Sequence, residues 1–224
     1  MLRVFSKRIY DIIFSLLISI LLIPFLLPII VVLIVTGEHQ VFYRQERIGL
    51  LNSKFMIWKF ATMVKNSSKM GTGSLTLRND PRILPFGKFL RKTKINEFPQ
   101  LINVILGDMS LVGPRPQMEI DFLKFPKNIQ NKIYNCKPGI TSVGSIVFRD
   151  EERWISNTKQ DKHEFYKTHI APYKGELELW YQKKSSIFFD TMVVLITIYA
   201  VFFPKTNLLY KLFKDIPKKP KHLD

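Results

Sequence analysis

Apolar residues are concentrated in two stretches of this chain, and the first lies close to the amino terminus. Residues 12–35 read IIFSLLISILLIPFLLPIIVVLIV and carry no charge. At about 1.5 Å of rise per residue, a helix of this length is about 36 Å long and is able to cross the core of a bilayer. The run is longer than the core of a secretory signal, and no small-residue cleavage site follows it. We therefore interpret it as a retained membrane anchor.

The anchor contains two prolines, Pro24 and Pro28, each of which removes a backbone donor and favours a bend. One alternative is a spanning helix with a kink, and the other is a re-entrant helix that breaks at Pro24 and returns to the same side. Lysine and arginine favour the cytosolic side of a membrane. Basic residues flank both ends of the run, namely Arg3, Lys7, Arg8, Arg44, Arg47 and Lys54. The charge pattern favours the re-entrant helix, because a span would leave one basic cluster outside.

The second apolar stretch, residues 187–203, reads IFFDTMVVLITIYAVFF and is too short for an ordinary span. Asp190 lies near its start, and lysines both precede and follow it. An amphipathic helix at the membrane interface, with a basic tail that attracts anionic lipid, explains this pattern better than a second span.

The polar middle of the chain predicts a small mixed domain. Residues 42–49 and 54–63 are rich in aromatic and β-branched side chains, which predicts two extended segments that form a short β-hairpin with its turn at 50–53. Residues 71–82 are rich in turn formers and predict a loop. Residues 86–107 have helical spacing that is interrupted near Pro99.

The carboxyl-terminal third, from residue 151, predicts amphipathic helices up to residue 182. The expected fold class is therefore α+β and mostly helical. The expected organisation is a membrane helix at 1–37, a catalytic core at 38–150 and a helical region at 151–224.

Charge and composition narrow the classes of function. A formal net charge of +16 predicts a phosphate-rich partner, and the long charge-free run favours a membrane and nucleotide substrates over nucleic acid. A single cysteine and four histidines without ligand spacing argue against a disulfide framework and a zinc site. The sequence has no Walker A motif, no dinucleotide-binding fingerprint and no GxSxG elbow.

Candidate chemistry lies in two neighbouring segments, INEFPQ at 95–100 and SLVGPRP at 110–116. Glu97 and Asp108 supply carboxylates that suit a divalent cation, and Arg115 stands between two prolines that restrict its backbone. Nearby positive charge comes from Lys59, Arg78, Arg82 and Arg91. Metal-binding acids surrounded by arginines are suited to phosphoryl transfer. The alternative reading is that Glu97 begins a helix and the arginines form a solvated rim.

Several segments together resemble one family of bacterial enzymes over nearly the whole chain. The matching stretches are KRIYDIIFSLLISILLIPFLL (7–27), FYRQERIG (42–49), KFATM (59–63), NDPRILPFGKFLRKTKINEFPQLINVILGDMSLVGPRP (79–116) and KPGIT (137–141). They resemble the bacterial sugar transferases known as monotopic phosphoglycosyl transferases. The resemblance implies transfer of a sugar 1-phosphate from a UDP-sugar to undecaprenyl phosphate, with release of UMP and with Mg²⁺ as cofactor. It also implies a re-entrant helix broken at Pro24, in the bacterial cytoplasmic (inner) membrane, with the catalytic domain facing the cytosol.

The resemblance also assigns roles to residues of this chain. It implies a catalytic acid at Glu97 and phosphate or substrate contacts at Lys59 and Arg115. Its Pro-Gly-Ile-Thr segment falls on residues 138–141, which adds Pro138, Gly139 and Thr141 to the substrate-binding candidates. We expect the metal near Glu97, with Asp108 as a second ligand or a helix cap. The partners expected are the UDP-sugar, undecaprenyl phosphate and anionic lipid, with no nucleic acid, and a homodimer is left open.

Three positions depart from the family pattern, and one of them bears on the mechanism. Ile23 replaces a serine, Ala61 replaces an arginine, and Asn96 stands where the family has its nucleophilic aspartate. A neutral amide is a very poor nucleophile toward phosphorus. Glu97 could attack instead, the lipid phosphate could attack directly, or the protein could be inactive. The intact surrounding block favours an active transferase in which Glu97 is essential. The alternative is a catalytically impaired membrane scaffold that recruits glycan-assembly enzymes.

Overall fold

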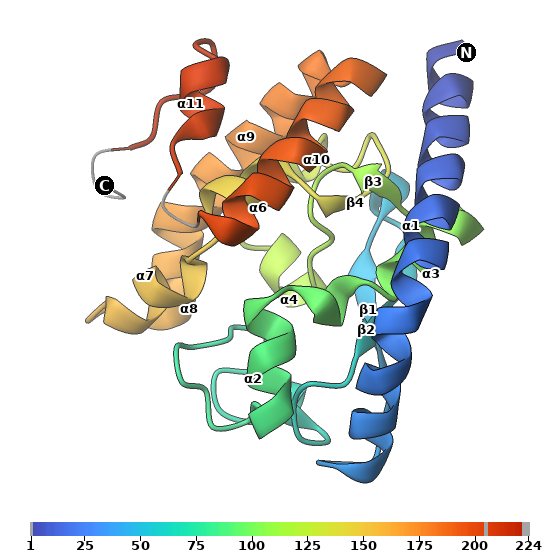
Figure 1. Ribbon diagram of the computed structural model, residues 1–224. Helices are drawn as coiled ribbons and strands as arrows, with labels where there is room; N and C mark the ends of the chain where they lie inside the picture. Colours follow the sequence, from blue (N-terminus) through green and yellow to red (C-terminus); the bar gives the residue numbers. More distant parts are fainter. Residues whose placement is uncertain (1, 204–205, 221–224) are drawn as a thin grey trace.

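The computed structural model describes residues 2–203 and 206–220, so residues 204–205 and 221–224 of the expected basic tail lie outside the described residues. Helix α1 (Leu2–Val35) runs along one side of the molecule, and the helices of the carboxyl-terminal half lie on the other side of strands β3 and β4 (Figure 1). The predicted α+β, mostly helical class is confirmed. The further helices are α2 (Pro85–Lys92), α3 (Gln100–Leu106), α4 (Glu119–Phe122), α5 (Lys127–Gln130), α6 (Val143–Val147), α7 (Glu151–Asn157), α8 (Lys162–Phe165), α9 (Ala171–Lys184), α10 (Ile187–Phe202) and α11 (Leu208–Leu212).

Helix α1 differs from the sequence prediction because it continues through Pro24 and Pro28 without a break. A proline removes only one of the helix's hydrogen bonds, and apolar helices tolerate this when the surrounding turns remain paired. The stretch from Val4 to Val35 is long and apolar enough to cross a membrane by length and composition. Large apolar side chains along it, among them Leu21 and Phe25, are exposed, which fits a surface that contacts lipid.

The predicted hairpin is confirmed. Strands β1 (Phe42–Ile48) and β2 (Lys54–Phe60) pair antiparallel, in a register that runs from Phe42 opposite Phe60 to Ile48 opposite Lys54. A 3₁₀ turn at Leu50–Asn52 connects them. Ile57 is buried on one face of the hairpin, and Ile48 and Phe60, at the two ends of the register, are buried on the other.

The interrupted helical pattern around Pro99 is also confirmed. Helix α2 ends at Lys92, a 3₁₀ turn covers Ile95–Glu97, and α3 begins at Gln100. The expected loop at 71–82 is folded around Asp80 and Arg82, both of which are buried. Short 3₁₀ and π-helical segments occur at Ser67–Lys69 and Tyr166–Ile170.

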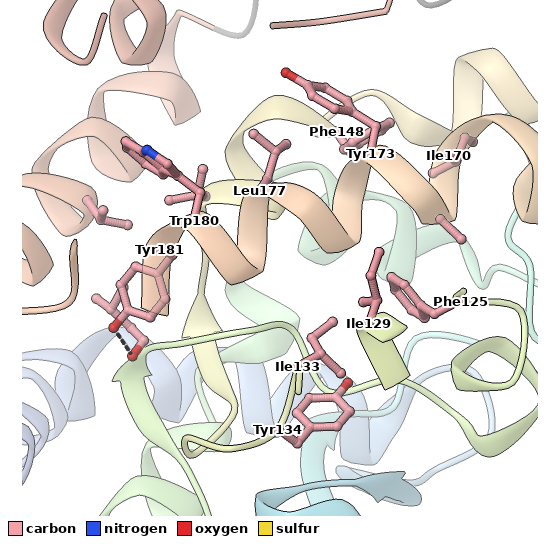
Figure 2. Packing of buried hydrophobic residues seen from close by; sticks show 14 of the residues in the cluster. Phe125, Ile129, Ile133, Tyr134, Phe148, Ile170, Tyr173, Leu177, Trp180 and Tyr181 are labelled. Atoms are coloured by element: carbon pink, nitrogen blue, oxygen red, sulfur yellow. Dashed lines mark hydrogen bonds between the residues drawn. The ribbon is translucent and has the colours of Figure 1, made fainter. Parts of the chain in front are cut away.

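Helix α9 forms the centre of the main core. Figure 2 shows Leu177 on one side of α9 and Ile129 and Ile133, of the segment around α5, on the other, and all three belong to one buried cluster. This one cluster of buried residues extends from Ile48 to Ile216, and Tyr10, Ile18 and Leu22 of α1 pack against it. Segments from all three predicted regions of the chain therefore share a core.

Helix α10 is apolar on both faces. Phe189, Val193 and Ile196 are buried against the core, whereas Phe188, Leu195 and other large apolar residues are exposed. An exposed apolar face is compatible with the interfacial helix expected from the sequence, and that location stays a prediction.

A second, parallel pair of strands crosses the core beside α1. Strand β3 (Ser110–Val112) pairs with β4 (Gly139–Thr141). The hydrogen bonds continue past β3, because Gly113 N–H donates to the Thr141 carbonyl at 3.1 Å and Gly139 N–H donates to the Pro114 carbonyl at 3.0 Å. A Cβ atom on Gly139 would lie 2.1 Å from the Gly113 nitrogen, so only glycine permits this approach.

We predict that Gly139→Ala lowers the free energy of unfolding by on the order of 3 kcal/mol, because the new methyl group meets backbone that is unable to move aside. Denaturant unfolding in detergent measures the change. The matched control is Gly71→Ala, whose Cβ meets nothing within 4 Å although its φ is +56°; we expect a cost of about 1 kcal/mol there from the backbone conformation alone. Equal effects of the two substitutions would contradict the close approach of β3 and β4.

Candidate active site

The centre of the candidate site is an ion pair between Glu97 and Arg115. Arg115 Nη1 donates to Glu97 Oε2 at 3.1 Å, and Nη2 donates to the other carboxylate oxygen. This is the two-pronged geometry in which arginine binds carboxylate most strongly. Glu97 is 8% exposed and Arg115 is partly buried, so the carboxylate of the pair lies largely out of water.

Local backbone constraints hold both partners in place. Lys94, with a φ of +62°, turns the chain from α2 into the 3₁₀ turn that carries Glu97. Arg115 lies between Pro114 and Pro116, whose rings fix φ. The Tyr134 hydroxyl donates to the Arg115 carbonyl at 2.9 Å, which fixes the segment further.

Several positively charged side chains surround the Glu97 carboxylate. Burial opposes the charge on Glu97, but Arg115, Lys94 and Lys59 outweigh burial and hold the pKa of Glu97 well below its ordinary value. The charge of Glu97 in turn raises the pKa of Arg115.

The cations affect one another as well. Burial, followed by the charge of Arg47, lowers the pKa of Lys59 well below its ordinary value. Burial and then Arg115 lower the pKa of Arg47 to about 10. Burial also lowers the pKa of Arg149, and Glu97 partly opposes this shift. Cations that are buried together in this way favour a bound anion, because the anion replaces the lost hydration and offsets their mutual repulsion.

The structure brings together four of the residues expected from the sequence, namely Lys59, Arg91, Glu97 and Arg115. Lys59 lies on β2 and interacts with the charges of Glu97, Arg115 and Arg91. Arg91, in the last turn of α2, donates to Glu152 at 3.1 Å. Three of the cations, Arg47, Lys94 and Arg149, were not among the expected site residues. Their signal was weak, because an arginine or lysine in a basic chain is not distinguished by its immediate neighbours.

Arg82 has a different role from the one expected. Its guanidinium group donates to the carbonyls of Ser67, Met70, Gly73 and Leu75 and to both oxygens of Asp80. The side chain is 5% exposed and its donors are occupied, so it organises the 64–82 loop and has no donor left for a phosphate. Arg78 is exposed, and its backbone N–H donates to the Ser156 hydroxyl at 2.8 Å, with no contact to Glu97.

The Pro-Gly-Ile-Thr segment packs beside β3 and α10. Its described contacts do not reach the Glu97–Arg115 pair directly. Pro138 and Gly139 accept and donate backbone hydrogen bonds beside β3. The Thr141 hydroxyl is 2.7 Å from that of Thr197 on α10. Their common effect is to fix the strand that leads to Arg115.

The expected metal ligands are not brought together. Asp108 is exposed beyond the carboxyl-terminal end of α3, where it accepts from Asn103 at 3.2 Å. Glu97 precedes the opposite end of this helix, so roughly 10 Å of helix lies between the two acids. Among the described residues, no group of three or more His, Cys, Asp or Glu side chains forms a metal site.

Asn96 nevertheless provides an oxygen that suits a magnesium ion. Its Oδ1 is buried and has no hydrogen-bond partner within the described structure. Mg²⁺ commonly takes one or two protein oxygens and completes its shell with water and substrate phosphates. The pair Asn96 and Glu97 fits a site of this kind, in which water and substrate phosphates would supply the remaining ligands.

A buried acid that the sequence reasoning missed lies behind Arg115. Glu178 of α9 is 1% exposed, and neither of its carboxylate oxygens has a hydrogen-bond partner in good geometry among the described residues. Burial raises the pKa of Glu178 to about 7, although Ser142, Lys174 and the backbone N–H groups of Arg115 and Gly144 lie near enough to oppose the shift. Lys174 is itself paired with Glu151.

We predict that Glu178 makes the free energy of unfolding fall as the pH rises from about 4.5 to about 7. In this window the unfolded chain has released the proton while the folded chain still holds it, so rising pH favours unfolding by an amount on the order of 1–3 kcal/mol. Denaturant titrations at several pH values should show that Glu178→Gln removes this loss and is more stable than wild type above pH 7. Parallel pH profiles of the two proteins would contradict the raised pKa. Glu176→Gln, an exposed neighbour on the same helix, is the control.

Comparison with known proteins agrees with this geometry. The sequence profile described as Bacterial sugar transferase matches residues 2–204. The uncharacterized sugar transferase EpsL of Bacillus subtilis (strain 168) is 34% identical over 161 residues, which cover 72% of this chain and 69% of that protein. The UDP-glucose:undecaprenyl-phosphate glucose-1-phosphate transferase of Klebsiella pneumoniae is 34% identical over 204 residues, which cover 89% of this chain and 41% of that protein.

A relative with a different sugar in its name is about as similar. The UDP-N-acetylgalactosamine-undecaprenyl-phosphate N-acetylgalactosaminephosphotransferase of Aeromonas hydrophila is 31% identical over 163 residues, covering 72% of this chain and 35% of that protein. The chain therefore spans less than half of the length of these two named transferases. The profile match and the similarity to EpsL each cover well over half of the chain, and on these grounds the chain belongs to the bacterial sugar transferase family.

Proposed function

We propose that this protein transfers a sugar 1-phosphate from a UDP-sugar to undecaprenyl phosphate and releases UMP. The observation that carries the proposal is the buried ion pair of Glu97 and Arg115, which lies among an excess of cations. The names of the relatives supply the chemical class of donor and acceptor. We propose no particular sugar, because relatives named for glucose and for N-acetylgalactosamine are similarly close.

The charge around the site suits a reaction between two phosphate compounds. A UDP-sugar carries a diphosphate and the lipid acceptor carries a phosphate, so bringing them together gathers several negative charges. Lys59, Arg91, Lys94 and Arg149 stand around the central pair and would neutralise these oxygens. Such preorganised positive groups commonly supply the largest part of catalysis in phosphoryl transfer.

Arg115 and Glu97 act together in this proposal. Before the donor binds, Glu97 holds the guanidinium group of Arg115 in position. When the donor binds, this guanidinium group turns from the Glu97 carboxylate to the phosphate oxygens of the donor. Both Glu97 oxygens accept from Arg115, and its pKa is held low, so Glu97 is a weak nucleophile in this arrangement. Glu97 is essential because its loss would leave Arg115 without its orienting partner.

The same facts favour direct transfer to the lipid. An oxygen of undecaprenyl phosphate attacks the phosphorus that bears the sugar, and a new phosphorus–oxygen bond forms. The bond from that phosphorus to the bridging oxygen breaks, and its electron pair leaves with UMP. A neutral amide at Asn96 is unable to replace the lipid oxygen as nucleophile. Its Oδ1, together with Glu97, would hold Mg²⁺. When bound, this ion would neutralise the phosphate oxygens of the substrate.

We further propose that the protein works at the cytosolic face of a bacterial inner membrane. The exposed apolar surface of α1 would lie in lipid, and α10 with the basic tail would lie at the anionic surface. The resulting lipid-linked sugar phosphate is the type of product that begins a capsule, O-antigen or exopolysaccharide. A homodimer is compatible with this placement.

The proposal is tested by release of UMP. Purified protein in vesicles should release UMP from at least one of a panel of UDP-sugars when undecaprenyl phosphate and Mg²⁺ are present. We expect Glu97→Gln to lower the rate at least about 100-fold, because Arg115 loses its charged partner. Asp108→Asn, the same change of acid to amide at the exposed end of α3, should stay within about threefold of wild type.

Further variants separate the alternatives. No UMP from wild type, Asn96→Asp or Asn96→Ala with any donor would favour the membrane scaffold, and activity in Asn96→Asp alone would indicate a disabled enzyme. Omission of the lipid acceptor distinguishes the routes. Direct transfer then gives no UMP, whereas attack by Glu97 would give up to one UMP for each enzyme molecule.

A further inference from the structure

One turn of α1 directs charged side chains toward the rest of the protein. Lys7 and Asp11 are four residues apart on α1 and therefore point to the same side of the helix. Asp11 is 3% exposed, which is unusual for a carboxylate unless it is paired. Its hydrogen-bond partners are residues of strand β3.

Asp11 holds strand β3 through one carboxylate oxygen. The Leu111 backbone N–H and the Ser110 hydroxyl both donate to Asp11 Oδ1, each at 3.1 Å. The backbone of β3 therefore bonds to β4 on one side and to a side chain of α1 on the other.

Lys7 holds the next carbonyl of the same strand. Its ammonium group donates to the Val112 carbonyl at 3.2 Å and pairs with Asp190 of α10, which is fully buried. Tyr181 of α9 lies within hydrogen-bond distance of both groups, 2.9 Å from the Val112 carbonyl (dashed in Figure 2) and 2.7 Å from Asp190. The carbonyl that precedes the Gly-Pro-Arg-Pro segment is therefore fixed from two sides.

Arg8, next to Lys7, contacts helix α3, which follows the turn that carries Glu97. Its guanidinium group donates to the carbonyls of Val104 and Ile105, the latter at 2.7 Å. These carbonyls belong to the last turn of α3, where the Val104 carbonyl also accepts from the Gly107 N–H at 3.1 Å. Helix α3 begins just after Glu97, and β3 ends just before Arg115.

We propose that Lys7, Arg8 and Asp11 are positioning residues for the transfer reaction, together with Tyr181 and Asp190. They hold α3 and β3 at the spacing that lets Glu97 and Arg115 meet. The membrane helix is thus part of the scaffold of the active site as well as an anchor. This inference rests on the proposed function for its effect on the reaction, and on the hydrogen bonds alone for its effect on the backbone.

The sharpest test compares two tyrosines, each of which contributes one hydroxyl to the contacts of this region. Tyr181→Phe removes the hydroxyl that contacts Val112 and Asp190. Tyr10→Phe removes a hydrogen bond of 3.1 Å between α1 and Thr191 of α10 that touches neither β3 nor α3. In the full chain in vesicles, we expect kcat to fall about 5- to 10-fold in Tyr181→Phe and to stay within twofold in Tyr10→Phe, with KM for the UDP-sugar little changed in both.

A second pair of variants tests Asp11 itself. Asp11→Leu removes the acceptor, and we expect kcat to fall about 100-fold, whereas Asp11→Asn keeps an oxygen for Leu111 N–H and should retain at least a tenth of the activity. Both proteins are checked for retention in the membrane after alkaline washing, so that loss of the anchor is separated from loss of positioning. A membrane-bound, folded Asp11→Leu protein with unchanged kcat would overturn the proposal.

Amide hydrogen exchange gives a readout that does not need activity. Without substrate, peptides covering residues 110–116 should exchange at least about tenfold faster in Tyr181→Phe and in any folded Asp11→Leu protein than in wild type or Tyr10→Phe. Unchanged exchange in Tyr181→Phe contradicts the positioning role, including when Asp11→Leu fails to fold. If wild type releases no UMP but exchange rises as expected, the proposed function fails while the positioning of the segment stands.

Discussion

The ion pair of Glu97 and Arg115 is the constraint around which this site is built. It joins two segments 18 positions apart, and it places a buried carboxylate against a partly buried guanidinium group. A buried charge without its partner is strongly destabilising, so each segment restricts the position of the other. The left-handed backbone at Lys94 and the two prolines beside Arg115 limit rotation at both ends. The backbone on both sides of the pair is therefore already in place before a substrate arrives.

The cations around this pair would make the site selective for anions. Arg47, Lys59 and Arg149 are all partly buried, and the pKa of each is lowered first by lost hydration. Their positive charges also oppose one another at short range. A bound diphosphate relieves both effects, which a neutral ligand is unable to do. The fold maintains this unfavourable concentration of charge because the core around α9 and the β3–β4 pair contribute the compensating stability.

The polar contacts of α1 give an otherwise apolar helix a fixed orientation. Apolar packing tolerates sliding and rotation, whereas Asp11 accepts from one backbone N–H of β3 and Arg8 from α1 donates to two carbonyls of α3. Buried hydrogen bonds to specific backbone groups permit one register, since a shift would leave buried polar groups unpaired. The apolar helix and the geometry of the candidate site are therefore coupled in this fold through the first three turns of α1.

The sequence by itself determined the local features: the hairpin at 42–60, the interruption near Pro99 and the apolar helix at the amino terminus. These follow from aromatic and β-branched content, from proline and from hydrophobicity, which act between near neighbours. It also grouped Glu97 with Arg115. Tertiary structure alone decided that α1 continues through Pro24, that Arg82 serves a loop, and that Glu178 lies buried behind the site. The reason is physical: the role of a charged side chain depends on the acceptors, donors and water around it, and residues distant in the sequence supply these.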